Sequence, residues 1–339
     1  MKYYFLSFTG IVTFVLLAGF TSDVPALEDK SVSEVLVSLG DKAMDHQPDF
    51  SYAGVSAEAG ADLVLRGKTK KANGNGNTSI QSKHFVCTSC HNVKREDPDL
   101  SKVDPLGRLK YAKENKLPFL QGTTLYGAVN RTSFYNDDYY KKYGELVTPA
   151  RNDIRGAIQL CAVECSQGRA LDDWELESVL AYLWTIDLKM GDLNLSNDEL
   201  KSLEQKLANK EKSEEAIKLI NSKYLKGAPA TFEDAPSDRK VGYAYEGNPE
   251  NGKDIYELGC LHCHKDERYS FFNLDNSKKS FKCLERDFPK YNEMSIYHVG
   301  RYGTKPLPGK KAYMPMYTLE KMSNNMMEDL RAYVEQMAE

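Results

Sequence analysis

The sequence predicts a mainly α-helical protein with two small domains, joined by a charged helix and a linker. Two observations indicate this: apolar residues recur at helical spacing in several segments, and one plan occurs twice along the chain. That plan is a short helix, a Cys-x-x-Cys-His motif, an irregular segment and a closing helix. A length of 339 residues has room for two domains. The expected division is domain 1 over residues 27–195, a helical linker over 196–240 and domain 2 over 241–339.

The N-terminus resembles an export signal. Lys2 is followed by a mostly apolar run over residues 5–20, so residues 1–26 are expected to be a signal peptide. An uncleaved anchor is the alternative, because the run approaches the length that spans a bilayer. Polar residues lower the hydrophobicity of this run, which favours a cleaved signal peptide over an anchor. We therefore expect a periplasmic location, with an N-terminal membrane anchor as the alternative.

In the first unit, helices are expected over residues 31–43, 61–66, 151–165 and 174–186. Asp172 or Asp173 is the expected cap of the last of these, which closes the domain. Residues 68–77, rich in Lys, Gly and Asn, are expected to form a loop before the first motif. Residues 92–149 show no long amphipathic period and predict an extended chain interrupted by short helices.

A single charged helix is expected over residues 196–226, opened by the capping-box sequence Ser196-Asn197-Asp198-Glu199. Residues 227–240 are predicted to be a linker because Ala, Pro, Asp and Ser are frequent there. In the second unit, a short helix over 251–258 is expected to deliver the second motif. Ser323 is the expected cap of a closing helix over 324–337.

The two motifs carry the chemistry. Cys87-Thr88-Ser89-Cys90-His91 and Cys260-Leu261-His262-Cys263-His264 both match the attachment signature of c-type haem. In this signature the two thiols form thioethers with the haem and the histidine becomes an iron ligand. A thioredoxin-like redox pair or half of a zinc site are the alternatives, but neither requires the histidine. We expect two covalently attached haem c groups, held by Cys87, Cys90, His91, Cys260, Cys263 and His264.

A sixth iron ligand, Met or His, is usual in an electron carrier. In the second unit, Tyr313-Met314-Pro315 resembles the Met-Pro segment of class I cytochromes c, and Met314 is therefore the expected ligand. The resemblance implies that both units are class I-like cytochrome c domains. Met316 is the reserve candidate, and His298 is a further possibility.

The first unit has neither Met nor His between His91 and the end of its closing helix. Cys161 and Cys165 are the remaining strong ligands, and a thiolate is an accepted haem ligand. Elimination therefore favours Cys161 as a metal ligand. A Lys ligand, a ligand from the N-terminal side, an open site, or a disulfide between Cys161 and Cys165 would also fit the sequence. The N-terminal candidates are Met44, His46 and His84.

Cys161 stands seven residues before Gly168, and a helix containing Ala181-Tyr182 follows. This segment is similar to the one that carries an axial cysteine in dihaem thiosulfate dehydrogenases, and to the haem subunit of the Sox thiosulfate-oxidising complex. The resemblance implies that Cys161 is an axial ligand, with a catalytic role if the protein is an enzyme, and that thiosulfate is a substrate. Two features depart from that pattern: Cys165 and the Tyr-rich insert over residues 126–143.

A net charge of −4 and a pI near 6.0 give no electrostatic case for nucleic acid. The motifs favour an electron carrier between a donor and an acceptor, such as other cytochromes or a membrane complex. The alternative is an oxidoreductase of thiosulfate, with Arg155 or Arg169 lining its site. A dihaem peroxidase is a third possibility, with no feature in its favour. Cys283 is expected to be a buried free thiol.

Overall fold

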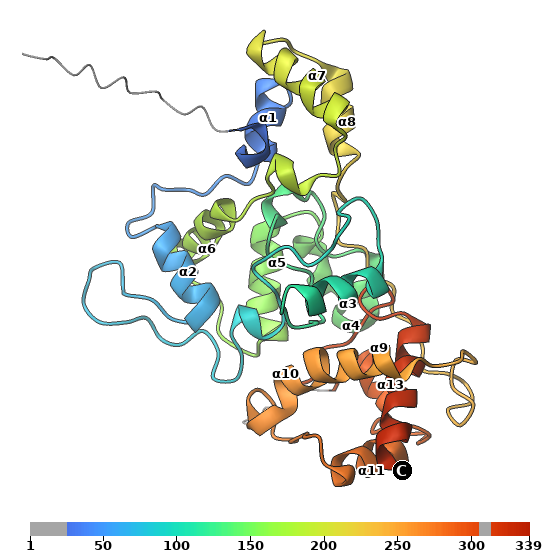
Figure 1. Ribbon diagram of the computed structural model, residues 1–339. Coiled ribbons are helices and arrows are strands. Elements are labelled where there is room, and N and C mark those ends of the chain that lie inside the picture. Colours follow the sequence, from blue (N-terminus) through green and yellow to red (C-terminus); the bar gives the residue numbers. More distant parts are fainter. Residues whose placement is uncertain (1–25, 305–312) are drawn as a thin grey trace, which may run out of the picture.

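The computed structural model describes residues 26–304 and 313–339 (Figure 1). The predicted signal peptide therefore lies, apart from Ala26, outside the described residues. Within the described part, helices dominate and β-structure is limited to isolated bridges, which confirms the mainly α-helical prediction. None of the described helices is long and apolar enough to cross a membrane.

The first unit is organised around a close crossing of α2 (Ala57–Arg66) and α6 (Asp173–Thr185). Ser56 caps α2, and Asp172 caps α6 while the Glu175 carboxylate accepts from the Asp172 N–H at 3.0 Å. A Cβ on Gly60 would overlap the Ser178 carbonyl oxygen, so only glycine allows this approach. The contact is filled by apolar side chains of both helices: Leu63, Val64, Val179, Leu180 and Leu183. The closing helix was predicted correctly.

The second unit repeats this arrangement with α9 (Pro249–Ile255) and α13 (Asn324–Ala338). A Cβ on Gly252 would overlap the Asp329 carbonyl oxygen, which parallels Gly60. Ser323 caps α13, as predicted, by accepting from the Met326 N–H at 3.3 Å. Two further helices, α11 (Lys278–Asp287) and α12 (Ile296–Tyr302), complete the unit. The opening and closing helices therefore contact each other in both units.

A separate helical cluster lies at one end of the molecule (Figure 1). It consists of α1 (Val32–Ser38), α7 (Asn197–Ala208) and α8 (Glu214–Asn221). The prediction of one helix over residues 196–226 was wrong, because the chain reverses after Asn209 through Lys210 at φ 53°. The reversal lets Leu203 of α7 and Ile220 of α8 bury against α1. The capping box at Ser196 is confirmed.

A buried ionic cluster joins the two units. Glu96 forms an ion pair with Arg108, whose Nε lies 3.2 Å from the carboxylate, and accepts from Lys321 at 3.1 Å; the Glu96 and Arg108 side chains are each 1% exposed. Burial alone would raise the pKa of Glu96, but the two cations outweigh it and hold that pKa below the ordinary 4.5. Nearby, the Tyr317 hydroxyl donates to the Phe119 carbonyl at 3.1 Å. The units therefore share one packed interface.

We expect Glu96→Gln to lower the free energy of unfolding by about 3–5 kcal/mol at neutral pH, because it leaves two buried cations without their anion. The folded-state pKa of Glu96 is depressed, so its stabilisation is complete above pH 4.5 and is lost as the pH falls further. The difference in unfolding free energy between wild type and Glu96→Gln should therefore shrink as the pH falls below 4.5. Urea unfolding at several pH values measures both effects.

Glu211→Gln is the matched control, since Glu211 is 48% exposed and pairs with Lys206 at the surface. We expect this substitution to change the unfolding free energy by less than about 0.5 kcal/mol. Equal stability of Glu96→Gln and wild type at pH 7 would contradict a structural role for the buried cluster.

Candidate functional site

Each Cys-x-x-Cys-His motif opens onto its own apolar cavity. The first cavity holds Cys87, Cys90 and His91, and its empty space, mouth included, is about 1550 Å³. The second holds Cys260, Cys263 and His264, with about 1510 Å³. The cavities adjoin, because both are lined by Phe85, Cys90, Gln121, Tyr313 and Pro315. Two large prosthetic groups would therefore lie side by side, separated by one layer of side chains.

The two motif histidines are oriented in the same way. The Nδ1 of His91 lies 2.7 Å from the Thr123 carbonyl oxygen, and the Nδ1 of His264 lies 2.8 Å from that of Phe272. A carbonyl only accepts, so Nδ1 carries the proton and Nε2 keeps a free lone pair. Burial lowers the pKa of both imidazoles, which favours the neutral form. Both imidazoles are therefore held in the form that can bind a metal ion, neutral and with the lone pair on Nε2.

Gly122 forms the surface behind the His91 ring. A Cβ there would come within 2.5 Å of the imidazole atoms Cε1 and Nδ1, and within 2.7 Å of the Cys90 carbonyl oxygen. The Gly122 N–H also donates to that carbonyl at 3.0 Å. The backbone at residue 122 thus fixes the ring plane by direct contact, and a side chain at this position would displace it.

A π-helical turn positions the two cysteines of the first cavity. The helix α5 (Ile154–Leu160), capped by Asp153, continues into a π-helix over Cys161–Cys165, where the Ser166 N–H donates to the Cys161 carbonyl at 2.9 Å. The predicted regular helix over residues 151–165 is thus corrected over its last turn. Cys161 and Cys165 both line the cavity. Such π-bulges are frequent at functional sites.

Cys161 faces His91 across the first cavity. Its Sγ lies 3.9 Å from the Nε2 of His91. Typical metal–nitrogen and metal–sulfur bonds of about 2.0 and 2.3 Å place two opposite ligand atoms roughly 4.3 Å apart. No cluster of three or more potential metal-binding side chains occurs in the described part of the chain. A six-coordinate haem iron takes two ligands from the protein, and the facing pair would supply both.

The two cysteines interact with each other. Both are free thiols and not a disulfide. The interaction with Cys161 lowers the pKa of Cys165 to about 7, against the effect of burial, and the pKa of Cys161 is raised. The Tyr143 hydroxyl, 3.3 Å from the Cys165 sulfur, also lowers the pKa of Cys165. Cys165 is therefore the more acidic of the two thiols.

In the second unit, Met314 lines the same cavity as His264. Its N–H donates to the Thr304 hydroxyl at 2.7 Å, which anchors the segment. Met316 is directed elsewhere: it is buried against Ala230 and Phe232 and lines the first cavity. His298 on α12 is not among the described residues that line the second cavity. The preference for Met314 over Met316 and His298 is consistent with this placement.

The remaining candidate ligands of the first site lie apart from it. The ring of His46 contacts the Val129 carbonyl at 2.7 Å, and neither His46, His84 nor Met44 is among the described residues lining the first cavity. No described lysine lines it either. The free thiol Cys283 sits partly exposed on α11, where Arg286 donates to it at 3.2 Å. The expectation that this thiol is buried is therefore corrected.

The expectation that Arg155 or Arg169 lines the site is wrong. Both pair with buried carboxylates at 2.6 Å, Arg155 with Glu177 and Arg169 with Glu175, and neither borders the first cavity. Arg131 borders it instead. Of the tyrosines in the insert, Tyr135, Tyr139 and Tyr143 line the cavity. Tyr140 bonds to the surface residue Thr148 at 2.7 Å.

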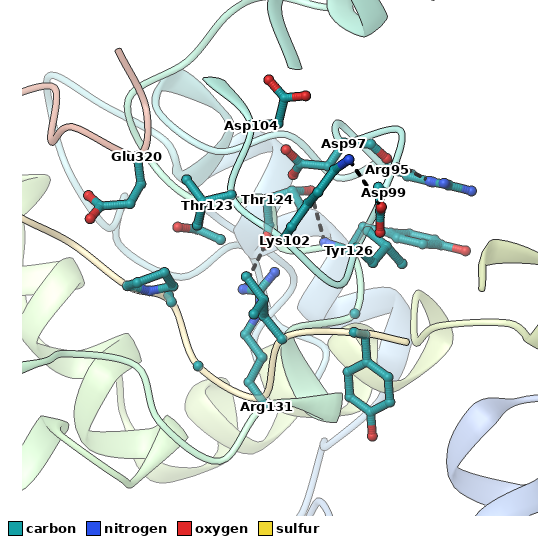
Figure 2. A pocket seen from close by; sticks show the side chains of 18 of the residues that line it. Arg95, Asp97, Asp99, Lys102, Asp104, Thr123, Thr124, Tyr126, Arg131 and Glu320 are labelled. Atoms are coloured by element: carbon teal, nitrogen blue, oxygen red, sulfur yellow. Dashed lines mark hydrogen bonds and ion pairs between the residues drawn. The ribbon is translucent and has the colours of Figure 1, made fainter. Parts of the chain in front are cut away.

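Arg131 also borders a smaller pocket (Figure 2), which shares Thr123 and Ala228 with the first cavity. It donates to the Thr124 carbonyl at 3.1 Å, next to the residue that orients His91. Burial lowers the pKa of Arg131, although the nearby carboxylates of Glu96 and Asp97 partly offset this by raising it. Sequence spacing alone does not distinguish Arg131 from Arg155. The position of Arg131 suits a carboxylate or another anion at the cavity edge.

We expect Gly122→Ala to reduce stability by about 1–3 kcal/mol and to disturb the orientation of His91, because the new methyl group overlaps the ring. Gly227→Ala is the control, since a Cβ there meets Ser133 at an ordinary 3.6 Å. Thermal unfolding and the histidine signals in the NMR spectrum report the two effects. Equal stability and equal histidine signals in Gly122→Ala and Gly227→Ala would contradict the view that residue 122 holds the His91 ring in place.

Comparison with protein-family models, curated proteins and solved structures returned no match for this chain. A functional assignment therefore depends on the site itself. Its main features are two cavities with a motif histidine in each, a cysteine opposite the first histidine and, in the wall of the second cavity, Met314 together with Met294, Met322 and Met327.

Proposed function

We propose that the protein is a dihaem c-type cytochrome that carries electrons in the periplasm between a donor and a respiratory acceptor. The observation that carries the proposal is the facing pair of His91 and Cys161 at 3.9 Å, inside a cavity that also holds both cysteines of the motif. A thioredoxin-like pair requires neither the histidine nor a facing ligand. The second cavity likewise holds the two cysteines and the histidine of its motif, Cys260, Cys263 and His264, and Met314 lines it as well.

In this proposal, each motif contributes two thioether cysteines and one histidine, and Cys161 and Met314 complete the two ligand sets. A bound haem supplies one-electron chemistry at its iron. The chain's own residues orient the ligands: the carbonyls of Thr123 and Phe272 hold the two imidazoles. Apolar walls exclude water from both cavities, which is a further means of setting a redox potential.

The shared wall supports two centres that act together. Phe85, Cys90, Gln121, Tyr313 and Pro315 line both cavities, so a single layer of side chains separates them. The buried contact of Glu96 with Lys321 fixes the two units to each other. We therefore propose two cytochrome c domains, over residues 27–195 and 241–339, whose centres lie close enough for direct exchange of electrons.

Oxidation of thiosulfate is the second candidate function. It is favoured by the cysteine facing His91 and by the arginine at the edge of the same cavity. A thiolate ligand donates electron density to iron. Arg131 would attract an anion to that edge. In the reaction, two thiosulfate ions lose one electron each and couple through a new S–S bond to tetrathionate, while the two centres accept the electrons.

We expect the exported wild-type protein to carry two covalent haems per chain, and Cys87→Ala or Cys260→Ala to carry one fewer. Each substitution removes one of the two thioether positions of its motif. Haem is counted by the pyridine haemochrome absorbance and by the intact mass. Cys283→Ala is the control and should retain both. Two covalent haems in both motif variants, or none in the wild type, would refute the proposal.

The two candidate functions differ in their response to thiosulfate. For a carrier, anaerobic thiosulfate leaves the oxidised protein unchanged, whereas dithionite reduces both centres. For the enzyme, thiosulfate reduces the protein within seconds, and Cys161→Ala abolishes this reduction. Haem absorbance measures both. Reduction that persists in Cys161→Ala would exclude the first site as the place of reaction.

A further inference from the structure

The proposed ligand Met314 lies in a short segment that is held from two sides. On one side is the end of α12, where the Met314 N–H donates to the Thr304 hydroxyl at 2.7 Å and the Thr304 N–H donates to the Met314 carbonyl at 3.0 Å. Gly303 permits this approach, because a Cβ there would overlap the Met314 carbonyl oxygen, and its φ is 71°. These contacts all arise within the second unit.

On the other side, the segment meets the Tyr-rich insert of the first unit. The hydroxyl oxygens of Tyr143 and Tyr313 lie 3.0 Å apart. The Lys142 ammonium lies 5.0 Å from the centre of the Tyr313 ring and donates to the Tyr302 carbonyl at 3.1 Å. Tyr313 directly precedes Met314, and Tyr302 belongs to the end of α12. Two adjacent side chains of the first unit therefore bind both of the chain segments that pair at Met314.

The insert also contacts the chain beyond Met314. Met316 is buried in a cluster with Phe232, and Tyr139 packs against that cluster. The rings of Tyr139 and Phe232 meet edge to face, with their centroids 5.1 Å apart. Tyr139 in turn stacks on Tyr143 at an interplanar angle of 16°. The two stacked tyrosines thus support the segment both before and after Met314.

These contacts between the units are largely shielded from water. Tyr313 is 6% exposed, and burial raises the pKa of both Tyr143 and Tyr313, so both hydroxyls stay protonated at neutral pH. Burial lowers the pKa of Lys142 only to about 8, so its ammonium is mostly charged at pH 7. Hydrogen bonds and cation–π contacts are stronger where water is excluded. The contacts are therefore suited to holding the segment firmly.

We propose that the Tyr-rich insert of the first unit positions the Met314 ligand of the second centre, with Lys142 and Tyr143 as the positioning residues. This inference rests on the proposed function. A thioether is a neutral and weak donor, so its bond to iron depends on how firmly the protein keeps the sulfur in place. Contacts that fix the neighbouring backbone strengthen that bond. The first unit thereby contributes to the affinity of the second centre for its methionine.

The test adds imidazole to the oxidised holoprotein, where it competes with Met314 for the iron of the second centre. Loss of the charge-transfer absorbance between the methionine sulfur and iron measures the displacement. We expect Tyr143→Phe, which keeps the stacked ring and removes only the hydroxyl, to raise the apparent affinity for imidazole about fivefold. Lys142→Met should have a similar effect, and the double variant should raise the affinity about tenfold. In each case less free energy is needed to move the segment away from the iron.

The two preceding residues of the insert provide matched controls. The Tyr140 hydroxyl bonds to Thr148 at 2.7 Å, and Lys141 pairs with Asp138 at 3.1 Å, so neither reaches the second unit by these bonds. Tyr140→Phe and Lys141→Met should therefore bind imidazole as the wild type does. Lys142→Arg should also stay close to the wild type, because a guanidinium keeps the positive charge and the donor groups.

Imidazole affinity equal to that of the wild type in both Tyr143→Phe and Lys142→Met would overturn the inference. A lower free energy of unfolding in these variants with unchanged imidazole affinity would also overturn it, because the contacts would then only stabilise the fold. Two covalent haems without the methionine absorbance in the wild type would remove Met314 as a ligand and overturn the inference, while the proposed function stands. A wild-type protein without covalent haem would refute the proposed function, and the inference with it.

Discussion

The structure depends on one repeated constraint, the close crossing of an opening helix and a closing helix at a glycine. Gly60 brings α2 against the backbone of α6 at Ser178, and Gly252 brings α9 against α13 at Asp329. In the first unit the Cys-x-x-Cys-His motif follows α2 after a loop, and in the second unit a π-helical turn over Tyr256–Cys260 connects α9 directly to the motif; each motif faces the cavity that the closing helix helps to enclose. Any larger residue at either glycine would separate the two helices and move the motif with them.

The two cavities share a plan but differ in the group that faces the histidine. A sulfur of a cysteine lies opposite His91, whereas the second cavity offers the thioether of Met314. The difference arises from local backbone: a π-helical turn carries Cys161, and an irregular Met-Pro segment carries Met314. The two cavities also differ in charge, because Arg131 lies at the edge of the first one. If each cavity holds a haem, as proposed, the two centres would have different reduction potentials.

Local sequence signals predicted much of this fold. Ser196, Asp172 and Ser323 each mark a helix start where a side chain or carboxylate satisfies free N–H groups, and those boundaries hold. The lack of other ligands in the first unit also selected Cys161, and the resemblance of the Met-Pro segment selected Met314; the structure places each of them in the wall of its cavity, and their role as ligands stays a prediction. Long-range contacts were not accessible in the same way. The reversal at Lys210 depends on burial against α1. Arg131 and Arg155 look alike in the sequence, and only the buried Glu177 distinguishes them in space.

The wall of the first cavity also has a consequence for the order in which the molecule matures. Tyr313, Pro315, Met316 and Thr318 complete that wall, although they belong to the second unit. The linker contributes as well, through Ala228. A chain that ends with the first unit lacks one side of the cavity. The pocket containing the first motif is therefore closed only when nearly the whole polypeptide is present, and a bulky ligand could reach Cys87 and Cys90 more easily before that point.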